Sequence, residues 1–117
     1  MAKVKYAPEA QNDLVAIKSY IKNDLGNSTA AESVIKRITK KGRLLETAPQ
    51  IGTPLSSVID IDTDYRFIRA GNYLSFYRYN EYDNTCYIDR VLYIRRDYLT
   101  ILFGNVEDID DTEESED

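Results

Sequence analysis

Two residues, Gly71 and Asn72, separate two stretches of strand-forming residues, and they limit the possible folds more than any other feature of this sequence. The stretches are 65–70 and 73–79, and both are rich in aromatic side chains, which favour strands. Gly-Asn readily supplies the positive φ angles of a two-residue hairpin turn. The sequence therefore predicts an antiparallel hairpin, with a further antiparallel strand over 86–94 after a polar turn.

Ahead of the hairpin, apolar residues recur at three- and four-residue spacing, which indicates two amphipathic helices. The first is predicted to begin at Pro8, a residue well suited to a first helical turn, and to end at Gly26. Ser28 or Thr29 is predicted to cap the second helix, and Thr29 with Glu32 has capping-box spacing. The short connection predicts an antiparallel helix hairpin.

The polar face of the second helix is strongly basic. Its charged residues are Lys36, Arg37, Lys40, Lys41 and Arg43. Such a run is most often a solvated helix face, and the alternative is a patch that faces phosphates.

The remaining segments complete a predicted α+β fold of two layers. Residues 3–6 alternate as a short strand, whereas 47–54 hold two prolines and a glycine and are predicted to be irregular. Residues 55–64 have no clear period, and 95–103 are predicted to pack back as a strand end or a helical turn. We expect a two-helix hairpin packed on a mainly antiparallel sheet of about four strands.

Charge is distributed unevenly along the chain. The net charge is -5, but residues 105–117 hold eight acidic side chains and no basic one, so residues 1–104 carry 15 basic and 12 acidic side chains, a balance of +3. We therefore expect one domain at 1–104 and an acidic tail at 105–117 that cannot fold alone. The tail is either a solubilising extension or a segment that covers the chain's own basic surface.

Several kinds of chemistry are excluded by composition. The chain has no histidine and one cysteine, Cys86, so Ser-His and Cys-His triads, the usual zinc sites and an internal disulfide are not expected. Asp60, Asp62 and Asp64 alternate as in a calcium loop, but the required glycine and terminal glutamate are missing. No metal or cofactor is expected. Neither a membrane span nor a signal peptide is indicated, so a cytoplasmic location is predicted.

Arginine and tyrosine are concentrated in the second half of the chain. Six of the eight arginines lie between Arg66 and Arg96, and eight of the ten tyrosines lie between Tyr65 and Tyr98. Guanidinium groups suit phosphate and carboxylate recognition, so this half is the predicted working surface. Arg95 and Arg96, at the predicted strand end, should point to opposite faces.

The other arginines of this half have competing interpretations. Arg66 and Arg69 are predicted to lie on opposite faces of their strand, so that one of them shares the surface of Arg95 and Arg96. Arg78 and Arg90 are predicted to pair across strands with Asp89 or Glu81.

The order of elements, with the strings YRFIRAGNYLSFYRY and VLYIRRDYLTILFG, resembles the RelE/ParE superfamily, the toxin halves of type II toxin-antitoxin modules. The resemblance covers residues 1–104. It implies two possible activities: RelE-like members are mRNA endonucleases of the ribosomal A site that use no metal, and ParE-like members poison DNA gyrase. A separate antitoxin protein, growth inhibition and plasmid stabilisation are implied in either case.

Carried onto this sequence, the family pattern makes Arg66, Arg95 and Arg96 the catalytic candidates of the nuclease reading. The residues implied for RNA or partner binding are Arg69, Arg78, Tyr93 and Tyr98. Positions where nuclease members carry polar groups hold Leu74, Leu102 and Phe103 instead. The pattern favours ParE-like inhibition of gyrase, with ribosome-dependent cleavage of mRNA as the alternative and a non-toxic antitoxin-binding relative as a third reading.

Overall fold

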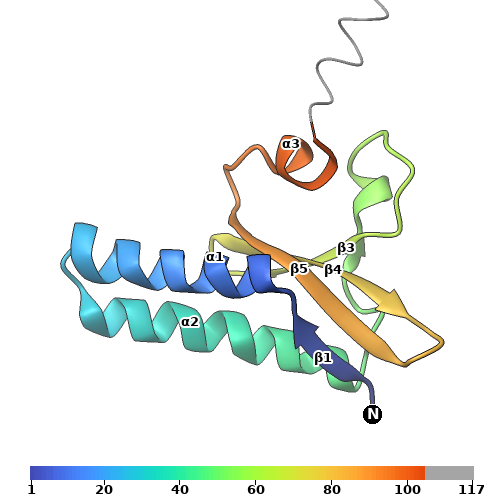
Figure 1. Cartoon of the computed structure of the whole chain (residues 1–117), viewed down its shortest axis with the longest axis horizontal. Coiled ribbons are helices and arrows are strands. Elements are labelled where there is room, and N and C mark those ends of the chain that lie inside the picture. The colour runs from blue at the N-terminus through green and yellow to red at the C-terminus, as the bar shows by residue number, and fades with distance from the viewer. Residues whose placement is uncertain (105–117) are drawn as a thin grey trace, which may run out of the picture.

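The computed structural model describes residues 1–104, so the expectations for the tail at 105–117 lie outside the described residues. The α-helices are α1 (Pro8–Ser19), α2 (Ser28–Arg43) and α3 (Tyr98–Phe103). The strands are β1 (Lys3–Tyr6), β2 (Thr53–Pro54), β3 (Arg66–Ala70), β4 (Tyr73–Asn80) and β5 (Thr85–Tyr93). The α1–α2 hairpin lies along the sheet, and α3 lies apart from it beyond the end of β5 (Figure 1).

The sheet has five strands in the order β1-β5-β4-β3-β2. The pairs β2–β3, β3–β4 and β4–β5 are antiparallel, whereas β1 pairs in parallel with β5. The predicted turn is present, because Gly71 has φ 61° between β3 and β4. The α+β prediction is confirmed, with one strand more than expected. The extra strand is β2, at Thr53 and Pro54 in the segment predicted to be irregular, where proline is tolerated because β2 is an edge strand.

The helix hairpin forms much as predicted, but its cap differs. A π-helical turn at Tyr20–Asp24 continues α1, and the chain then turns into α2. Asn27, and neither Ser28 nor Thr29, is the N-cap: its side-chain oxygen accepts a hydrogen bond from the Ala30 backbone N–H at 2.9 Å. The predicted capping box is therefore wrong, because the box requires Thr29 as the N-cap and the helix begins two residues earlier.

The main core lies between the helix hairpin and one face of the sheet. It contains fully buried residues of α2, β4 and β5, among them Ile38, Tyr77 and Ile88. The Tyr77 hydroxyl accepts a hydrogen bond from the Gly52 backbone N–H at 2.9 Å, which fixes the loop that leads to β2. The buried Tyr77 side chain thus anchors this loop to the sheet.

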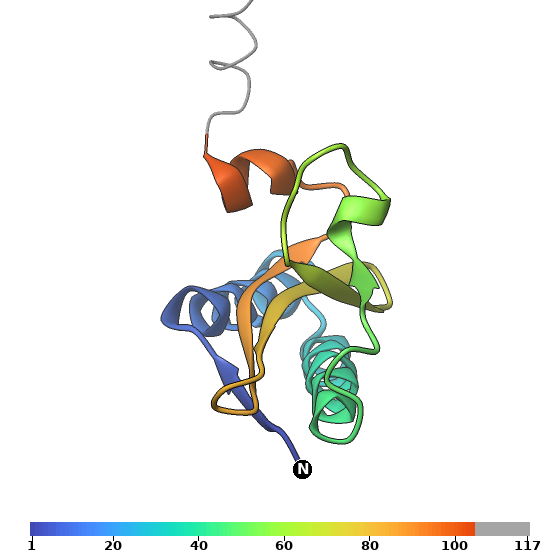
Figure 2. The ribbon, with the colours of Figure 1, turned by 90° about the vertical axis from the view of Figure 1, so that its right-hand side faces the viewer.

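A second core covers the opposite face of the sheet. Leu55, Leu74, Phe76 and Leu92 are buried there, beneath partly buried side chains of α3 and of the segment before β3. Figure 2 shows α3 and that segment together above the sheet, on the side away from the helix hairpin. The terminal segment therefore packs back as a helical turn, one of its two predicted forms. Among the described residues, no helix has the length and apolar character needed to cross a membrane.

Candidate partner-binding groove

A groove of about 830 Å³ lies between the far end of the helix hairpin and the end of the sheet. Both layers contribute apolar side chains, and one arginine stands among them. The lining includes Ile17, Tyr20, Leu25, Val34, Tyr93 and Arg96. Its position follows from the fold: the π-helical turn carries the end of the first helix past the sheet, and the β3–β4 turn lies opposite.

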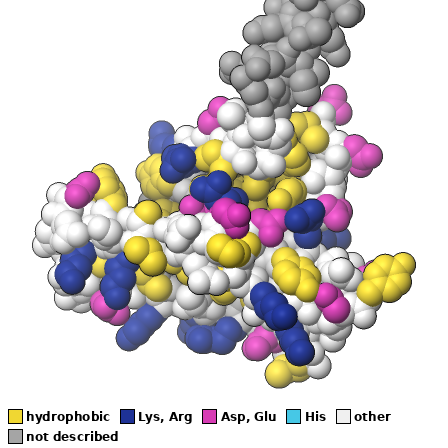
Figure 3. Space-filling model, in the orientation of Figure 1, with side chains coloured by type: hydrophobic (Ala, Val, Ile, Leu, Met, Phe, Trp, Pro, Cys, Tyr) yellow, Lys and Arg dark blue, Asp and Glu magenta, His cyan; other side chains and the backbone are white. Residues whose placement is uncertain are grey.

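Several large apolar side chains of the lining are exposed to solvent. The exposed fractions are 51% for Tyr20, 60% for Leu25 and 40% for Tyr93. The Tyr93 ring is held edge-on against Tyr73, with centroids 5.7 Å apart. Contiguous exposed apolar surface of this kind marks a site of interaction. Hydrophobic and basic side chains gather side by side on the face to the left of α3 (Figure 3).

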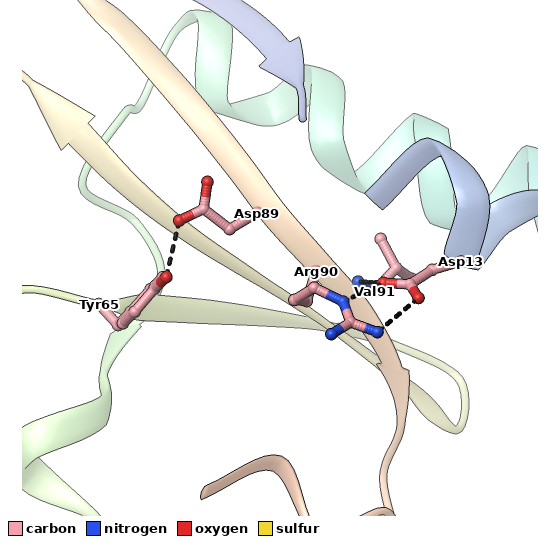
Figure 4. Close-up of polar contacts among 5 residues, drawn as sticks. All are labelled: Asp13, Tyr65, Asp89, Arg90 and Val91. Atoms are coloured by element: carbon pink, nitrogen blue, oxygen red, sulfur yellow. Dashed lines mark hydrogen bonds and ion pairs between the residues drawn. The ribbon is translucent and has the colours of Figure 1, made fainter. Parts of the chain in front are cut away.

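One wall of the groove is fixed by an ion pair between α1 and β5. Arg90 donates from Nε and Nη2 to the two carboxylate oxygens of Asp13, each at 2.8 Å, and the Val91 backbone N–H donates to the same carboxylate at 2.9 Å (Figure 4). This hydrogen bonding raises the pKa of Arg90. The predicted pairing of Arg90 with Asp89 or Glu81 is therefore wrong, because Arg90 pairs with Asp13 of α1 instead.

A second polar cluster lies on the other side of the sheet. The Tyr65 hydroxyl donates to Asp89 at 2.7 Å, and Arg78 donates to the same carboxylate at 2.9 Å, as predicted for Arg78 (Figure 4 shows the first contact). The Arg78 guanidinium also lies 5.0 Å from the centre of the Tyr65 ring. Burial, and then the bond to Asp89, raise the pKa of Tyr65 to about 12. Tyr65 therefore holds its proton firmly.

Two other candidate arginines are engaged with the backbone. Arg66 donates to the carbonyl oxygens of Gln50 and Gly52, at 3.1 and 2.8 Å, and holds the crossing loop. Arg69 donates to the carbonyl oxygen of Gly71 at 2.7 Å and holds its own hairpin turn. Both side chains stabilise loops in this structure.

Arg95 and Arg96 differ from the rest. Both are exposed, and neither side chain has a hydrogen bond or ion pair with another residue of 1–104. They lie in a turn beyond β5, closed by a bond from the Arg96 N–H to the Tyr93 carbonyl at 2.9 Å. The expected strand-like alternation is therefore wrong, because β5 ends at Tyr93. Arg96 lies on the lining of the groove.

The remaining candidate positions lie in the second core. Tyr98 packs on Phe76, with ring centroids 5.2 Å apart, and Phe103 packs edge-on against Tyr65 at 5.9 Å. Leu74 is 6% exposed, and Leu102 is a partly buried residue that packs against the same core. The structure thus places Tyr93 and Arg96 at the groove, and Tyr98 on the other face of the sheet. In residues 1–104 no group of acidic, cysteine or histidine side chains is placed to hold a metal ion.

Sequence reasoning missed the helical side of the groove. From sequence, Tyr20 is assigned to no surface and Leu25 is placed only at the end of the apolar stripe of the first helix, although an aromatic residue near a predicted helix end is a usable signal. The shared lining with Tyr93 depends on how the hairpin lies over the sheet, and no local pattern encodes that.

The chain belongs to the ParE toxin family of type II toxin-antitoxin systems, because residues 4–98 match the family model described as the ParE toxin of parDE. The predicted membership of the RelE/ParE superfamily is thereby confirmed. A comparison with curated protein sequences found no significant match.

Solved structures share the fold. The chromosomal ParDE system from P. aeruginosa matches with 18% identity and a TM-score of 0.66, over 81% of this chain and 98% of that one. The RelBE2 toxin-antitoxin complex from Mycobacterium tuberculosis matches with 18% identity and a TM-score of 0.57, over 79% of this chain and 96% of that one. The intact RelBE toxin-antitoxin complex from E. coli matches with 14% identity and a TM-score of 0.50, over 82% of this chain and 100% of that one.

Proposed function

We propose that this toxin arrests growth by binding DNA gyrase, in the manner of ParE, and that a cognate antitoxin neutralises it in the cytoplasm. The observation that carries the proposal is the apolar groove with an exposed arginine pair at its edge. This is a surface suited to holding a protein, since apolar contacts supply affinity and peripheral charges supply orientation.

The alternative, endonuclease activity, has weaker support from the site. Cleavage by the 2'-hydroxyl of the message needs a base, stabilisation of phosphorane charge and an acid for the leaving group. Arg66 donates to loop carbonyls, and Leu102 and Phe103 lie in an apolar core. Tyr93 and Tyr98 keep hydroxyl groups, but the two side chains lie on different faces of the sheet.

We further propose that the groove receives a segment of the antitoxin. Two of the structural neighbours are toxin-antitoxin complexes by description. A groove lined by Ile17, Tyr20 and Val34 suits the apolar face of an amphipathic helix or the side chains of an extended segment. Arg96 would pair with an acidic residue beside that apolar face.

Induction of the protein in a bacterium tests the choice of target. We expect a replication block with an SOS response and intact messages, and loss of growth arrest for Arg95→Gln with Arg96→Gln. The matched control is Lys40→Gln with Lys41→Gln, which removes the same charge from α2 and should leave the arrest intact. Arrest of translation with cleaved messages would contradict the proposal and support the nuclease. No arrest at all would support the non-toxic relative.

A further inference from the structure

Two arginines beside the groove lack a partner among residues 1–104, whereas the other four of the sheet region have one. Those four are Arg66, Arg69, Arg78 and Arg90, and each donates to an oxygen within the fold. We propose that residues 105–117 of the same chain bind across Arg95 and Arg96 and the adjoining end of the groove, where they compete with a partner protein.

The composition of this segment complements the surface. Residues 105–117 contain eight acidic side chains and no basic one, and their two aliphatic residues are Val106 and Ile109. Carboxylates pair well with guanidinium groups, and the two aliphatic side chains match the exposed apolar lining. The segment therefore has both kinds of group that the surface requires.

The connection is short enough for the segment to reach its own chain. α3 has 6 residues, so its ends are about 9 Å apart, and only Asp97 separates Arg96 from its first residue. Beyond Gly104, the thirteen residues of 105–117 can span up to about 45 Å when extended. A short tether gives an effective concentration on the order of millimolar, so contacts that are weak individually can hold the segment.

The contact itself does not depend on the target of the toxin. Its regulatory consequence does rest on the proposed function, because a partner that uses the groove must first displace residues 105–117. Added salt screens the attraction between the acidic side chains and the two arginines, so it should weaken the internal contact and leave the apolar lining accessible to a partner.

Paramagnetic relaxation in the full chain tests the contact without a partner. A nitroxide is attached at Ser115→Cys. Cys86 stays unlabelled, because it is buried and burial raises the pKa of its thiol to about 11. We expect the amide signals of Leu25, Tyr93 and Arg96 to lose about half their intensity at about 20 mM NaCl and to recover it at about 500 mM, where screening is strong.

Charge variants of the labelled chain separate this contact from a general attraction to basic surface. Arg95→Gln with Arg96→Gln should restore the signals at low salt, as should replacement of the acids at 107, 108, 110 and 111 by their amides. Lys40→Gln with Lys41→Gln should leave the broadening unchanged.

Four results would overturn the proposal. They are no broadening at low salt, equal broadening without the two arginines, loss of broadening in the lysine variant, and broadening that appears only when a labelled chain is mixed with a second, isotope-enriched copy. If the chain arrests growth but shows no broadening, the contact is rejected and the proposed function stands. If the chain shows the broadening but leaves gyrase unaffected, only the proposed target is rejected.

Discussion

At the scale of single residues, two buried hydroxyl groups show how little of a side chain's role its identity reveals. Tyr6 and Tyr77 both point into the main core. Tyr77 accepts a backbone hydrogen bond from Gly52, whereas the buried Tyr6 hydroxyl has no partner among residues 1–104. An unpaired buried hydroxyl loses its hydration without compensation.

Removal of the Tyr77 hydroxyl should therefore destabilise the fold, whereas removal of the Tyr6 hydroxyl should stabilise it. We expect Tyr77→Phe to lower the free energy of unfolding by about 1–3 kcal/mol, because it leaves the Gly52 N–H unpaired, and Tyr6→Phe to raise it by about 1 kcal/mol. Urea unfolding of the two variants measures both. A loss of stability in Tyr6→Phe equal to that in Tyr77→Phe would show that the Tyr6 hydroxyl has a favourable interaction.

The carboxylate of Asp13 supports the wall of the groove, and its charge can be removed with little change of shape. Asp13→Asn should cost about 2–3 kcal/mol of unfolding free energy, because it breaks a partly buried pair with Arg90. The control is Lys18→Gln, which removes an exposed pair with Glu32 and should have no measurable effect. Equal losses in the two variants would contradict the structural role given to Asp13.

At the scale of elements, close approach of α2 to β1 depends on Gly42. A Cβ atom at this position would lie 2.5 Å from the Tyr6 hydroxyl but 3.6 Å from the ring carbon that bears it. Gly42→Ala should therefore destabilise the protein by about 1–3 kcal/mol. In the Tyr6→Phe background it should instead be neutral or stabilising by up to about 1 kcal/mol, since alanine favours helix.

Thermal or urea unfolding of the two single variants and the double variant gives this coupling. Additive effects of the two substitutions would show that the hydroxyl is not what limits the approach of the helix.

The elements that sequence predicts well here are those with local signals. The helix hairpin follows from three- and four-residue spacing, and the sheet hairpin from Gly71 and Asn72. The parallel pairing of β1 with β5 is long-range, so no local pattern shows it. Strand β2 contains Pro54 and only two residues, so propensity argues against it. The groove was beyond prediction for the same reason, since Tyr20 and Tyr93 meet only in the packed fold.

At the scale of the whole molecule, the burial of tyrosine side chains should make the free energy of unfolding decrease at alkaline pH. Burial raises the pKa of Tyr6, Tyr73 and Tyr77, and burial with the Asp89 bond raises the pKa of Tyr65 to about 12 from 10.0. Above pH 10 the unfolded chain loses these protons while the folded chain keeps them, so stability is complete below pH 10 and falls as pH rises toward 12.

Urea unfolding at several pH values between 9 and about 11.5 measures this fall. Tyr65→Phe should make the slope shallower, because it removes one of the protons that the folded state retains. An unchanged slope in this variant would mean that Tyr65 ionises alike in the folded and unfolded chains.

The fold leaves one large apolar groove and an adjacent exposed arginine pair as its most distinctive surface among the described residues. If that surface binds gyrase, the purified chain must act on the purified enzyme without other factors.

Inhibition of DNA supercoiling by purified gyrase tests this claim most directly. We predict that the chain inhibits supercoiling and that Arg95→Gln with Arg96→Gln weakens inhibition by about tenfold or more, equivalent to about 1.4 kcal/mol of binding free energy. Unimpaired supercoiling, together with cleavage of mRNA on purified ribosomes by the same preparation, would contradict the proposal.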